Sequence, residues 1–205
     1  DIPAVEAALC EPLSCSAYAV NQTGMGMEDT VVVSGLGAIG MGMLQFALLR
    51  NPKRVIGIDT NDALCEIAKK LGAAEVLNPM KEDVTKRIME LTDGVGCDIY
   101  MEATGNPASV ETGMNCLRKQ GMLFIYSVFK KKAEIDLNQI SEFKELRVIG
   151  GHLSPGAFPY TIDCLEKGKI NAKVMVTDIF ALNEIDEAMS AKKPDRVSIK
   201  TVLVP

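Results

Sequence analysis

The feature that most constrains the fold of this chain is a glycine-rich turn, Gly-Leu-Gly-Ala-Ile-Gly at 35–40, directly after the valine run 31–33. It matches the pattern G-x-G-x-x-G between an expected strand and an expected helix, where it binds a dinucleotide. The first glycine permits a tight turn, the second lets backbone amides approach a pyrophosphate, and the third lets the helix pack on the strand. The helix start adds free N–H donors and a positive dipole end. The candidate cofactor-binding residues are Gly35, Gly37, Ala38, Ile39 and Gly40.

The alternative interpretation of this turn is a glycine-rich connection that only packs tightly within a parallel sheet. The surrounding pattern fits either use, because short β-branched runs alternate with longer helical stretches along the chain. This alternation predicts an α/β fold, a doubly wound parallel sheet (Rossmann fold) covered by helices on both faces. The expected strands are 31–33, 54–58, 75–77, 98–101, 122–126 and 146–149, and the expected helices between them are 39–49, 62–71, 83–91, 107–117 and 137–143.

The two ends of the chain do not continue this alternation. We expect three parts: a helical lead-in at 1–24, a dinucleotide-binding domain at 25–152, and a C-terminal segment at 153–205. In the lead-in, Pro12 is expected to interrupt the helix and to begin a second one at its first position. In the last part we expect helices at 157–165 and 183–191, and strands at 176–180 and 198–204.

Asp59 makes the cofactor prediction more specific. It ends the second expected strand and lies 19 residues after Gly40 (59 minus 40). An acid at this place accepts hydrogen bonds from the adenosine ribose and repels a 2′-phosphate. The following residues, Thr60, Asn61 and Asp62, include no arginine for that phosphate, so NAD is favoured over NADP. The alternative role for Asp59 is a helix cap or turn residue, which is compatible with the first.

Composition excludes several other classes of protein. Acidic residues outnumber basic ones by 27 to 22, which argues against a nucleic-acid partner. No apolar run is long enough to span a membrane, and no secretory signal is visible, so we expect a cytoplasmic protein. The six cysteines are scattered without a C-x-x-C pair, which predicts reduced and mostly buried thiols. A zinc site made by this chain alone is disfavoured, because structural zinc ligands usually come in closely spaced pairs.

Several segments, in order, resemble the C-terminal part of medium-chain, zinc-dependent alcohol dehydrogenases, in the polyol (sorbitol/threonine) dehydrogenase branch. The resemblance covers nearly all 205 residues. The segments that carry it are Ala-Ala-Leu-Cys-Glu-Pro-Leu at 7–13, Val-Ser-Gly-Leu-Gly-Ala-Ile-Gly at 33–40, Lys-Leu-Gly-Ala at 70–73 with Asn-Pro at 78–79, Glu-Ala-Thr-Gly at 102–105, and Ser-Ile-Lys-Thr-Val-Leu at 198–203.

The resemblance implies a cofactor, a metal and a reaction. Family members transfer a hydride from a secondary alcohol or polyol to NAD, while zinc binds and activates the alcohol oxygen. Their zinc ligands lie in a β-rich N-terminal domain that is not recognisable in these 205 residues, so the chain looks like a piece of a longer protein. We therefore expect it to bind cofactor and, alone, to be inactive. Glu11 matches the acid that approaches the catalytic zinc in this branch, although it could merely cap the helix at Pro12.

Other site residues are implied by the same resemblance. Thr104 and Gly105 match the turn that passes the adenosine side of the cofactor. Ser127 and Val128 match the strand end whose backbone meets the nicotinamide carboxamide, and Lys200 matches a basic residue that reaches the pyrophosphate. The alternative for Lys200 is an ordinary solvated lysine.

One departure from the branch bears on the substrate. Sorbitol-type members tend to carry an Arg-Tyr pair where this chain has Gly-Gly-His-Leu-Ser at 150–154, which weakens sorbitol itself as the substrate. His152 could line the nicotinamide end of the cleft, or it could be a half-buried structural histidine.

The resemblance also implies a homodimer or homotetramer. The alternating segment 133–137 is the expected shared edge strand, although Lys130, Lys131 and Lys132 could keep that edge monomeric.

Two other functions remain open. One is an NAD-binding regulatory or sensor module without catalysis. The other is a nucleotide fold that binds S-adenosylmethionine, which the full glycine motif together with Asp59 disfavours.

Overall fold

The computed structural model describes residues 1–190 and 197–205. Its centre is a six-stranded sheet in the order β3-β2-β1-β4-β5-β6, in which all neighbouring strands are parallel. This arrangement confirms the predicted doubly wound parallel sheet. The strands are β1 Thr30–Ser34, β2 Arg54–Ile58, β3 Glu75–Leu77, β4 Cys97–Glu102, β5 Leu117–Ile125 and β6 Arg147–Gly150.

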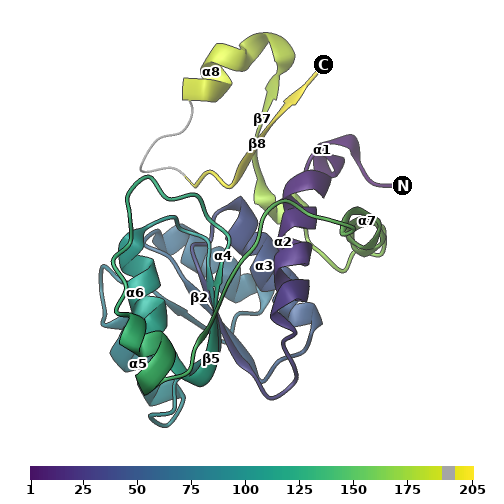
Figure 1. Cartoon of the computed structure of the whole chain (residues 1–205). Helices are drawn as coiled ribbons and strands as arrows, with labels where there is room; N and C mark the ends of the chain where they lie inside the picture. Colours follow the sequence, from purple (N-terminus) through teal and green to yellow (C-terminus); the bar gives the residue numbers. More distant parts are fainter. Residues whose placement is uncertain (191–196) are drawn as a thin grey trace.

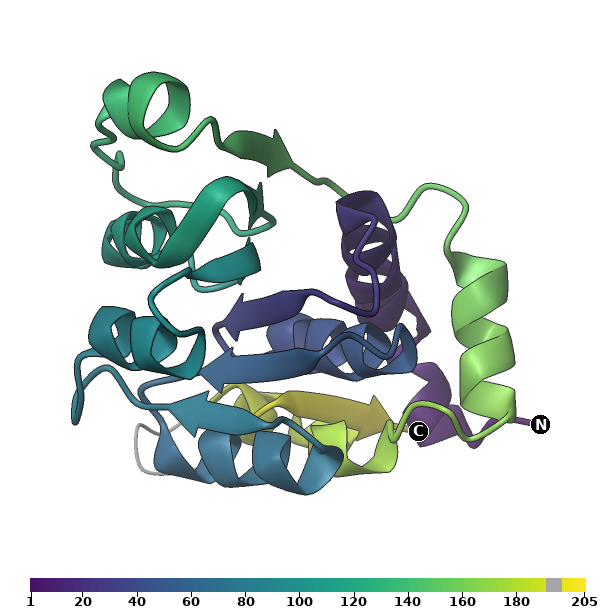
Figure 2. The same ribbon diagram turned by 90° about the horizontal axis from the view of Figure 1, so that it is seen from below.

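Helices cover both faces of the sheet (Figure 1). One hydrophobic core lies between the sheet and α2, α3 and α4, and a second lies between the sheet and α5 and α6. Viewed from below, α5 and α6 stand on one side of the strands and α2 and α7 on the other (Figure 2). The helices are α1 Ala4–Ala7, α2 Cys10–Thr23, α3 Ala38–Leu49, α4 Asp62–Leu71, α5 Val84–Leu91, α6 Pro107–Cys116 and α7 Phe158–Glu166.

Local sequence signals explain where these helices begin and end. The Asn61 side chain accepts hydrogen bonds from the first amides of α4, and Gly72 ends that helix with a φ of 111° that favours glycine. Asn106 caps α6 in the same way and is followed by Pro107 at the first helical position. These caps account for the end of α4 and the start of α6 at the positions expected from the sequence, 71 and 107.

The predicted break of the N-terminal helix at Pro12 is wrong. The structure interrupts the helix at Ala8 and Leu9, and Pro12 lies within the first turn of α2. Proline is tolerated there because the first four N–H groups of a helix have no intrahelical partner. The Leu13 amide then donates the first bond of the continuing helix to the Leu9 carbonyl, at 2.9 Å.

Helix α2 packs closely against α3, the helix that follows the glycine-rich turn. The Ser16 hydroxyl donates to the Ile39 carbonyl at 2.8 Å, so it joins α2 to the first turn of α3. A Cβ atom on Gly42 would lie 2.4 Å from the Ser16 oxygen, which shows why a glycine is needed at this crossing. The lead-in segment therefore shares the core of the sheet and fixes the position of α3.

The C-terminal segment forms a second, parallel two-stranded sheet that projects beyond the main sheet (Figure 1). It contains η2 Lys173–Met175, β7 Val176–Ala181, η3 Leu182–Glu184, α8 Ile185–Ser190 and β8 Lys200–Val204. The expected end of the last helix, Ala191, lies outside the described residues. The buried side chain of Gln45 on α3 joins this segment to the main domain. Its Oε1 atom accepts from the backbone N–H of Asn171 at 2.8 Å, and its Nε2 atom donates to Met175 Sδ at 3.3 Å.

The expected edge strand at 133–137 does not form. This segment has no strand pairing, and the short π-helix η1 Gln139–Phe143 follows it. The edge of the sheet is instead β6, which pairs with β5 on one side, while no strand of the described chain pairs with its other side. A period-two pattern of apolar and acidic residues forms a strand only where it pairs with a neighbouring strand, and segment 133–137 pairs with none in the described chain.

The cysteines are unpaired, as predicted. Five are buried and Cys10 is half-buried. No described helix has the length and apolar character needed to cross a membrane.

Candidate functional site

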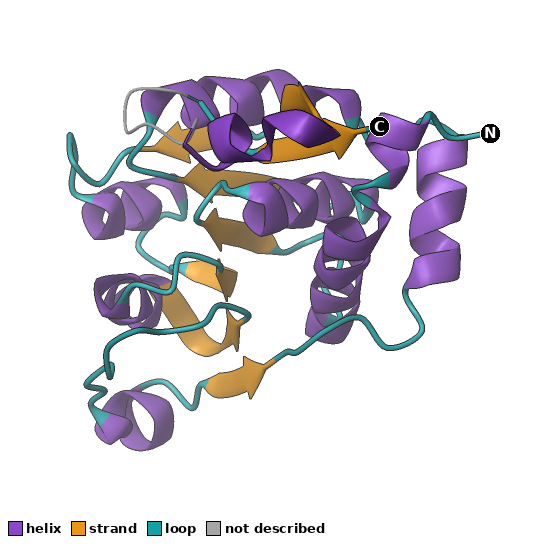
Figure 3. Cartoon of the chain, turned by 90° about the horizontal axis from the view of Figure 1, so that it is seen from above, coloured by secondary structure: helices purple, strands orange, loops and turns teal. Residues whose placement is uncertain are grey.

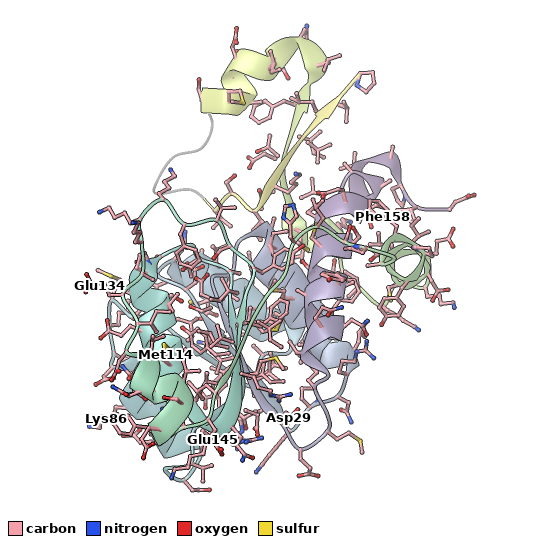
Figure 4. All side chains as sticks on the ribbon, in the orientation of Figure 1. Asp29, Lys86, Met114, Glu134, Glu145 and Phe158 are labelled. Atoms are coloured by element: carbon pink, nitrogen blue, oxygen red, sulfur yellow. The ribbon has the colours of Figure 1, made fainter. Side chains whose placement is uncertain are left out.

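The candidate site lies at the carboxyl ends of the parallel strands. Asp29 and Glu145, which precede β1 and β6, mark the opposite, amino-terminal end of the sheet at the bottom of Figure 4. The chain winds outward in one direction from β1 to β3 and in the other from β4 to β6, so the order reverses between β1 and β4. Open α/β sheets bind ligands at such a reversal. Seen from above, the strands form one layer between helices (Figure 3).

A cleft of about 550 Å³ opens at this reversal. Its walls come from the glycine-rich turn, the end of β2, the residues after β3 and the start of α6. The lining residues are Ser34, Gly35, Gly37, Ile58, Asp59, Thr60, Leu64, Pro79, Met80, Val84, Tyr100, Ala103, Thr104, Asn106, Ala108, Ser109 and Thr112.

The three glycines of the turn differ in what surrounds them. A Cβ atom on Gly40 would lie 1.6 Å from the Gly35 carbonyl oxygen, and one on Gly35, whose φ is 92°, would lie 2.9 Å from the backbone of Ala103. A Cβ atom on Gly37 would meet no described atom within 4 Å, and its φ of −66° suits any residue. Packing thus explains Gly35 and Gly40, whereas the free space at Gly37 is available to a ligand.

Helix α3 begins at this open glycine. Gly37 is its N-cap, and the first bond of the helix runs from the Met41 amide to the Gly37 carbonyl at 2.8 Å. Within the described part of the chain, no side chain caps these first amides, and the first turn holds no acidic residue. Free amides at the positive end of a helix dipole attract an anion such as a phosphate. Ala38 and Ile39, in this first turn, are both half-buried.

Asp59 stands beside the turn, at the end of β2. One of its carboxylate oxygens accepts from the backbone N–H of Leu36 at 2.7 Å, and the other accepts from the backbone N–H of Asn61 at 2.8 Å. Asp59 therefore serves as a turn residue, while the cap of α4 is Asn61. Each carboxylate oxygen has a second lone pair, so Asp59, which is half-buried in the cleft wall, can also accept from a ligand hydroxyl.

The floor of the cleft carries a small hydroxyl network. Ser34 and Ser109 share a hydrogen bond of 2.8 Å, and Ser109 lies 3.2 Å from the Tyr100 hydroxyl. Tyr100 is fully buried, and this burial raises the pKa of its phenol. Its ring rests on Gly113 of α6, where a Cβ atom would approach within 2.6 Å of it. The network supplies neutral donors and acceptors beneath the cleft.

A buried carboxylate, Glu102, ties the end of β4 to the end of β5. One of its oxygens accepts from the Thr104 amide at 2.7 Å, the Thr104 hydroxyl and the Gly105 amide at 3.1 Å. The other accepts from the Ser127 hydroxyl and, at 3.4 Å, from the Gly105 amide. Glu102 is a site residue that the sequence did not predict. The available signal was a charged residue that ends a buried strand and directly precedes Ala-Thr-Gly.

The structure brings the two predicted strand-end pairs together. A Cβ atom on Gly105 would lie 2.6 Å from the Val128 carbonyl oxygen, so the turn after β4 touches the end of β5. Thr104 lines the cleft, and the Val128 side chain is 91% exposed at the surface.

Glu11 lies on α2, outside the cleft lining. Its side chain is exposed, and one of its oxygens accepts from the Cys15 thiol at 3.3 Å. Burial raises the pKa of Cys15, and the neighbouring Glu11 carboxylate raises it further. Beside them, the Tyr126 hydroxyl donates to the Leu153 carbonyl, and burial raises the pKa of Tyr126 as well. Both groups are therefore protonated near neutral pH.

Of the predicted site residues, the cleft lining includes Gly35, Gly37, Asp59 and Thr104. It does not include Glu11, Ala38, Ile39, Gly40, Gly105, Ser127, Val128, Lys200 or His152. Lys200 begins β8 and is half-buried. His152 is exposed just after β6, so it is not the half-buried structural histidine of the alternative interpretation. Within residues 1–190 and 197–205, no three His, Cys, Asp or Glu side chains gather closely enough to hold a metal ion.

Comparison with known proteins places this geometry in a family. The model of the family described as zinc-binding dehydrogenase matches residues 38–167. The chain is 40% identical over 205 residues to the erythritol/L-threitol dehydrogenase of Mycolicibacterium smegmatis, a match that covers 100% of this chain and 57% of that protein. It is 32% identical over 204 residues to the L-threonine 3-dehydrogenase of Pyrococcus abyssi, covering 96% and 58%.

A solved structure agrees with the sequence relatives. A zinc-binding dehydrogenase structure from Sinorhizobium meliloti, determined with NADP bound, superimposes with a TM-score of 0.91 at 27% identity and covers 100% of this chain and 61% of that one. The chain belongs to the zinc-binding dehydrogenase family. The predicted resemblance to its polyol and threonine branch is confirmed. The chain spans little more than half the length of these curated relatives.

Proposed function

We propose that this chain is the cofactor-binding part of an NAD-dependent dehydrogenase that acts on secondary alcohols or polyols. The observation that supports this function best is the free space at Gly37, at the uncapped start of α3 and beside the Asp59 carboxylate. Packing requires no glycine there, whereas a pyrophosphate bound to the helix amides does. The name of the Mycolicibacterium smegmatis relative, an erythritol/L-threitol dehydrogenase, supports a polyol as the substrate.

The described residues suit each part of a nicotinamide dinucleotide. The amides of Gly37, Ala38 and Ile39 face the pyrophosphate, Asp59 the adenosine ribose, and Thr104 with Gly105 the adenosine side of the cleft. The backbone at 127–128 is assigned to the nicotinamide carboxamide, and Lys200 to the pyrophosphate. When bound, the dinucleotide supplies the redox chemistry by exchanging a hydride with the substrate carbon. The protein residues bind the cofactor, orient it and limit the access of water.

In this proposal, Glu11 is the one described residue that we assign to the catalytic zinc ion. A carboxylate oxygen is a ligand that Zn²⁺ accepts, and Glu11 is exposed on α2, where it can reach a metal directly or through water. As the family resemblance implies, we assign the other zinc ligands to a β-rich N-terminal domain of the longer protein. In the same proposal, residues 1–24 and 153–205 join the part of the protein that carries the ligands, and residues 25–152 bind the cofactor.

Cofactor preference tests the proposed function. The protein should bind NADH more tightly than NADPH, because the Asp59 carboxylate repels a 2′-phosphate. Asp59→Ala should weaken NADH binding by about 1–2 kcal/mol, the scale of a hydrogen bond to a charged group. Fluorescence titration of both cofactors measures the preference. Equal affinity of the unchanged protein for NADH and NADPH would contradict the assignment.

A control is needed because Asp59 also holds the amides of Leu36 and Asn61. Asp59→Asn keeps a carbonyl oxygen for one of these amides and removes the charge. It should bind NADPH better than the unchanged protein does. The thermal unfolding midpoint of each variant, measured without cofactor, separates the loss of the turn from the loss of the ribose contact.

We also propose that the protein is a homodimer or homotetramer. The supporting observation is the unpaired side of β6, where a row of backbone donors and acceptors faces no strand of the described chain. A symmetry-related copy of the same strand can satisfy these groups. Light scattering at micromolar protein should give at least twice the chain mass of 22.1 kDa. A mass of one chain would contradict the shared edge.

A further inference from the structure

We propose that Glu102 is a positioning residue. It holds the adenosine side and the nicotinamide side of the cofactor site in a fixed position relative to each other. The inference rests on the proposed dinucleotide-binding function and assigns a role to a residue that touches no ligand itself. Its basis is the position of Glu102 between Thr104, which lines the adenosine side of the cleft, and Ser127, at the strand end assigned to the nicotinamide side.

The surroundings of Glu102 suit an ionised carboxylate. Its side chain has no exposed surface, and it accepts from four donor groups: two amides, of Thr104 and Gly105, and two hydroxyls, of Thr104 and Ser127. A carboxylate is the side chain that only accepts, with several lone pairs on two oxygens. Buried charges of this kind persist where hydrogen bonds satisfy them.

The network extends from Glu102 to the start of α6. The Thr104 hydroxyl, which donates to Glu102, accepts from the Asn106 amide at 2.9 Å. Asn106 in turn caps α6, whose first turn carries Ser109 at the cleft floor. On the adenosine side, the turn therefore has several supports: the cap, the backbone of β4 and the contact of Gly35 with Ala103.

Beyond the end of β5, the Tyr126 hydroxyl donates to the Leu153 carbonyl and Val128 touches Gly105, but Ser127 itself has a single hydrogen bond to the described residues. Beyond the last ladder residue, Ile125, the Tyr126 amide still donates to the Glu102 carbonyl at 3.0 Å. The next residue, Ser127, is held through its hydroxyl on the Glu102 carboxylate, and Val128 beyond it is 91% exposed. Loss of the Ser127 hydroxyl should therefore move the nicotinamide side of the cleft and leave the adenosine side in place.

Two probes of different length separate these halves. ADP carries the adenosine and pyrophosphate, and NADH adds the nicotinamide ribose and ring. In Ser127→Ala we expect the dissociation constant of NADH to rise about tenfold, the scale of one charge-assisted hydrogen bond, and that of ADP to stay within about twofold. Ser127→Thr keeps the hydroxyl and should retain the original ratio of ADP to NADH affinity. Calorimetric titration of the purified protein measures both constants.

A double-mutant cycle then tests whether Ser127 acts through Glu102. In Glu102→Gln, the remaining side-chain oxygen faces the backbone N–H groups of Thr104 and Gly105, and the new NH2 group faces Ser127. The Ser127 hydroxyl therefore loses its charged acceptor. Ser127→Ala should change the affinity ratio less in this background, because the neutral amide nitrogen can still donate to the Ser127 hydroxyl oxygen but the charge-assisted bond is gone. Ser141→Ala is the matched control, because among the described residues that hydroxyl donates to the Leu137 carbonyl at the surface. The ratio of ADP to NADH affinity in this variant should equal that of the unchanged protein.

The outcomes are distinct. An equal weakening of ADP and NADH in Ser127→Ala, or no change in either, would overturn the positioning role, and so would a full effect of this substitution in the Glu102→Gln background. If Glu102→Gln does not fold, the difference between Ser127→Ala and Ser127→Thr still decides. Failure of the unchanged protein to bind either probe would overturn the proposed function and this inference together.

Discussion

Gly37→Val should reduce the affinity for NADH at least about 100-fold, which corresponds to about 2.7 kcal/mol, and leave the fold intact. The Gly37 backbone is extended and accepts a branched residue, and the structure has no described atom within 4 Å of the new Cβ. The added side chain therefore extends from an unobstructed Cβ position into the space in which a pyrophosphate would approach the amides of α3. Fluorescence titration with NADH measures the loss, and thermal unfolding confirms that the protein remains folded.

Gly26→Val is the matched control for this experiment. Gly26 lies in the exposed loop before β1, its φ is not positive, and the nearest atom to an added Cβ is an Asp29 oxygen at 3.9 Å. It should bind NADH with unchanged affinity. If Gly37→Val also binds NADH normally, the cleft at the start of α3 is not the dinucleotide site.

Gly40→Ala should destabilise the protein by about 3 kcal/mol or more, within the range of severe overpacking. The added methyl group would lie 1.6 Å from the Gly35 carbonyl oxygen, a backbone atom that cannot move without opening the turn between β1 and α3. Chemical denaturation monitored by circular dichroism measures the free energy of unfolding. A protein too unstable to purify would agree with this expectation.

Gly37→Ala provides the comparison for Gly40→Ala. It makes the same chemical change three residues earlier in the same turn, where the added carbon meets no described atom within 4 Å. Its free energy of unfolding should stay within about 1 kcal/mol of the original value. Equal stability of the two variants would show that close packing does not explain the third glycine of the motif.

The sequence predicts the central sheet well because local signals and burial agree there. The buried strands β1, β2 and β5 contain continuous apolar runs at 31–33, 55–58 and 122–125, and the helices carry their own caps, such as Asn61 and Asn106. The errors fall where a pattern depends on neighbours distant in sequence. Segment 133–137 alternates like a strand but has no strand beside it, and Pro12 is accommodated because α2 starts two residues earlier.

In the candidate site, too, the features set by local sequence could be predicted and those set by distant neighbours could not. The glycine motif and Asp59 are recognisable because their spacing is local. The role of Glu102 could not be predicted, because it depends on Ser127, which is 25 residues away and approaches only through the pairing of β4 with β5. Asp59 also accepts a hydrogen bond from the backbone N–H of Leu36. This contact could not be predicted either, because it depends on the glycine-rich turn lying beside the end of β2.

The bond between Ser16 and Ile39 has a consequence for motion. Because Ser16 on α2 holds the first turn of α3, and Gly42 allows the two helices to touch, α2 and α3 should move as one rigid body. Glu11 stands near the start of α2, so the carboxylate assigned to the metal and the amides assigned to the pyrophosphate belong to this same body. Any movement of the segment that enters α2 would thus also move the glycine-rich turn at the start of α3.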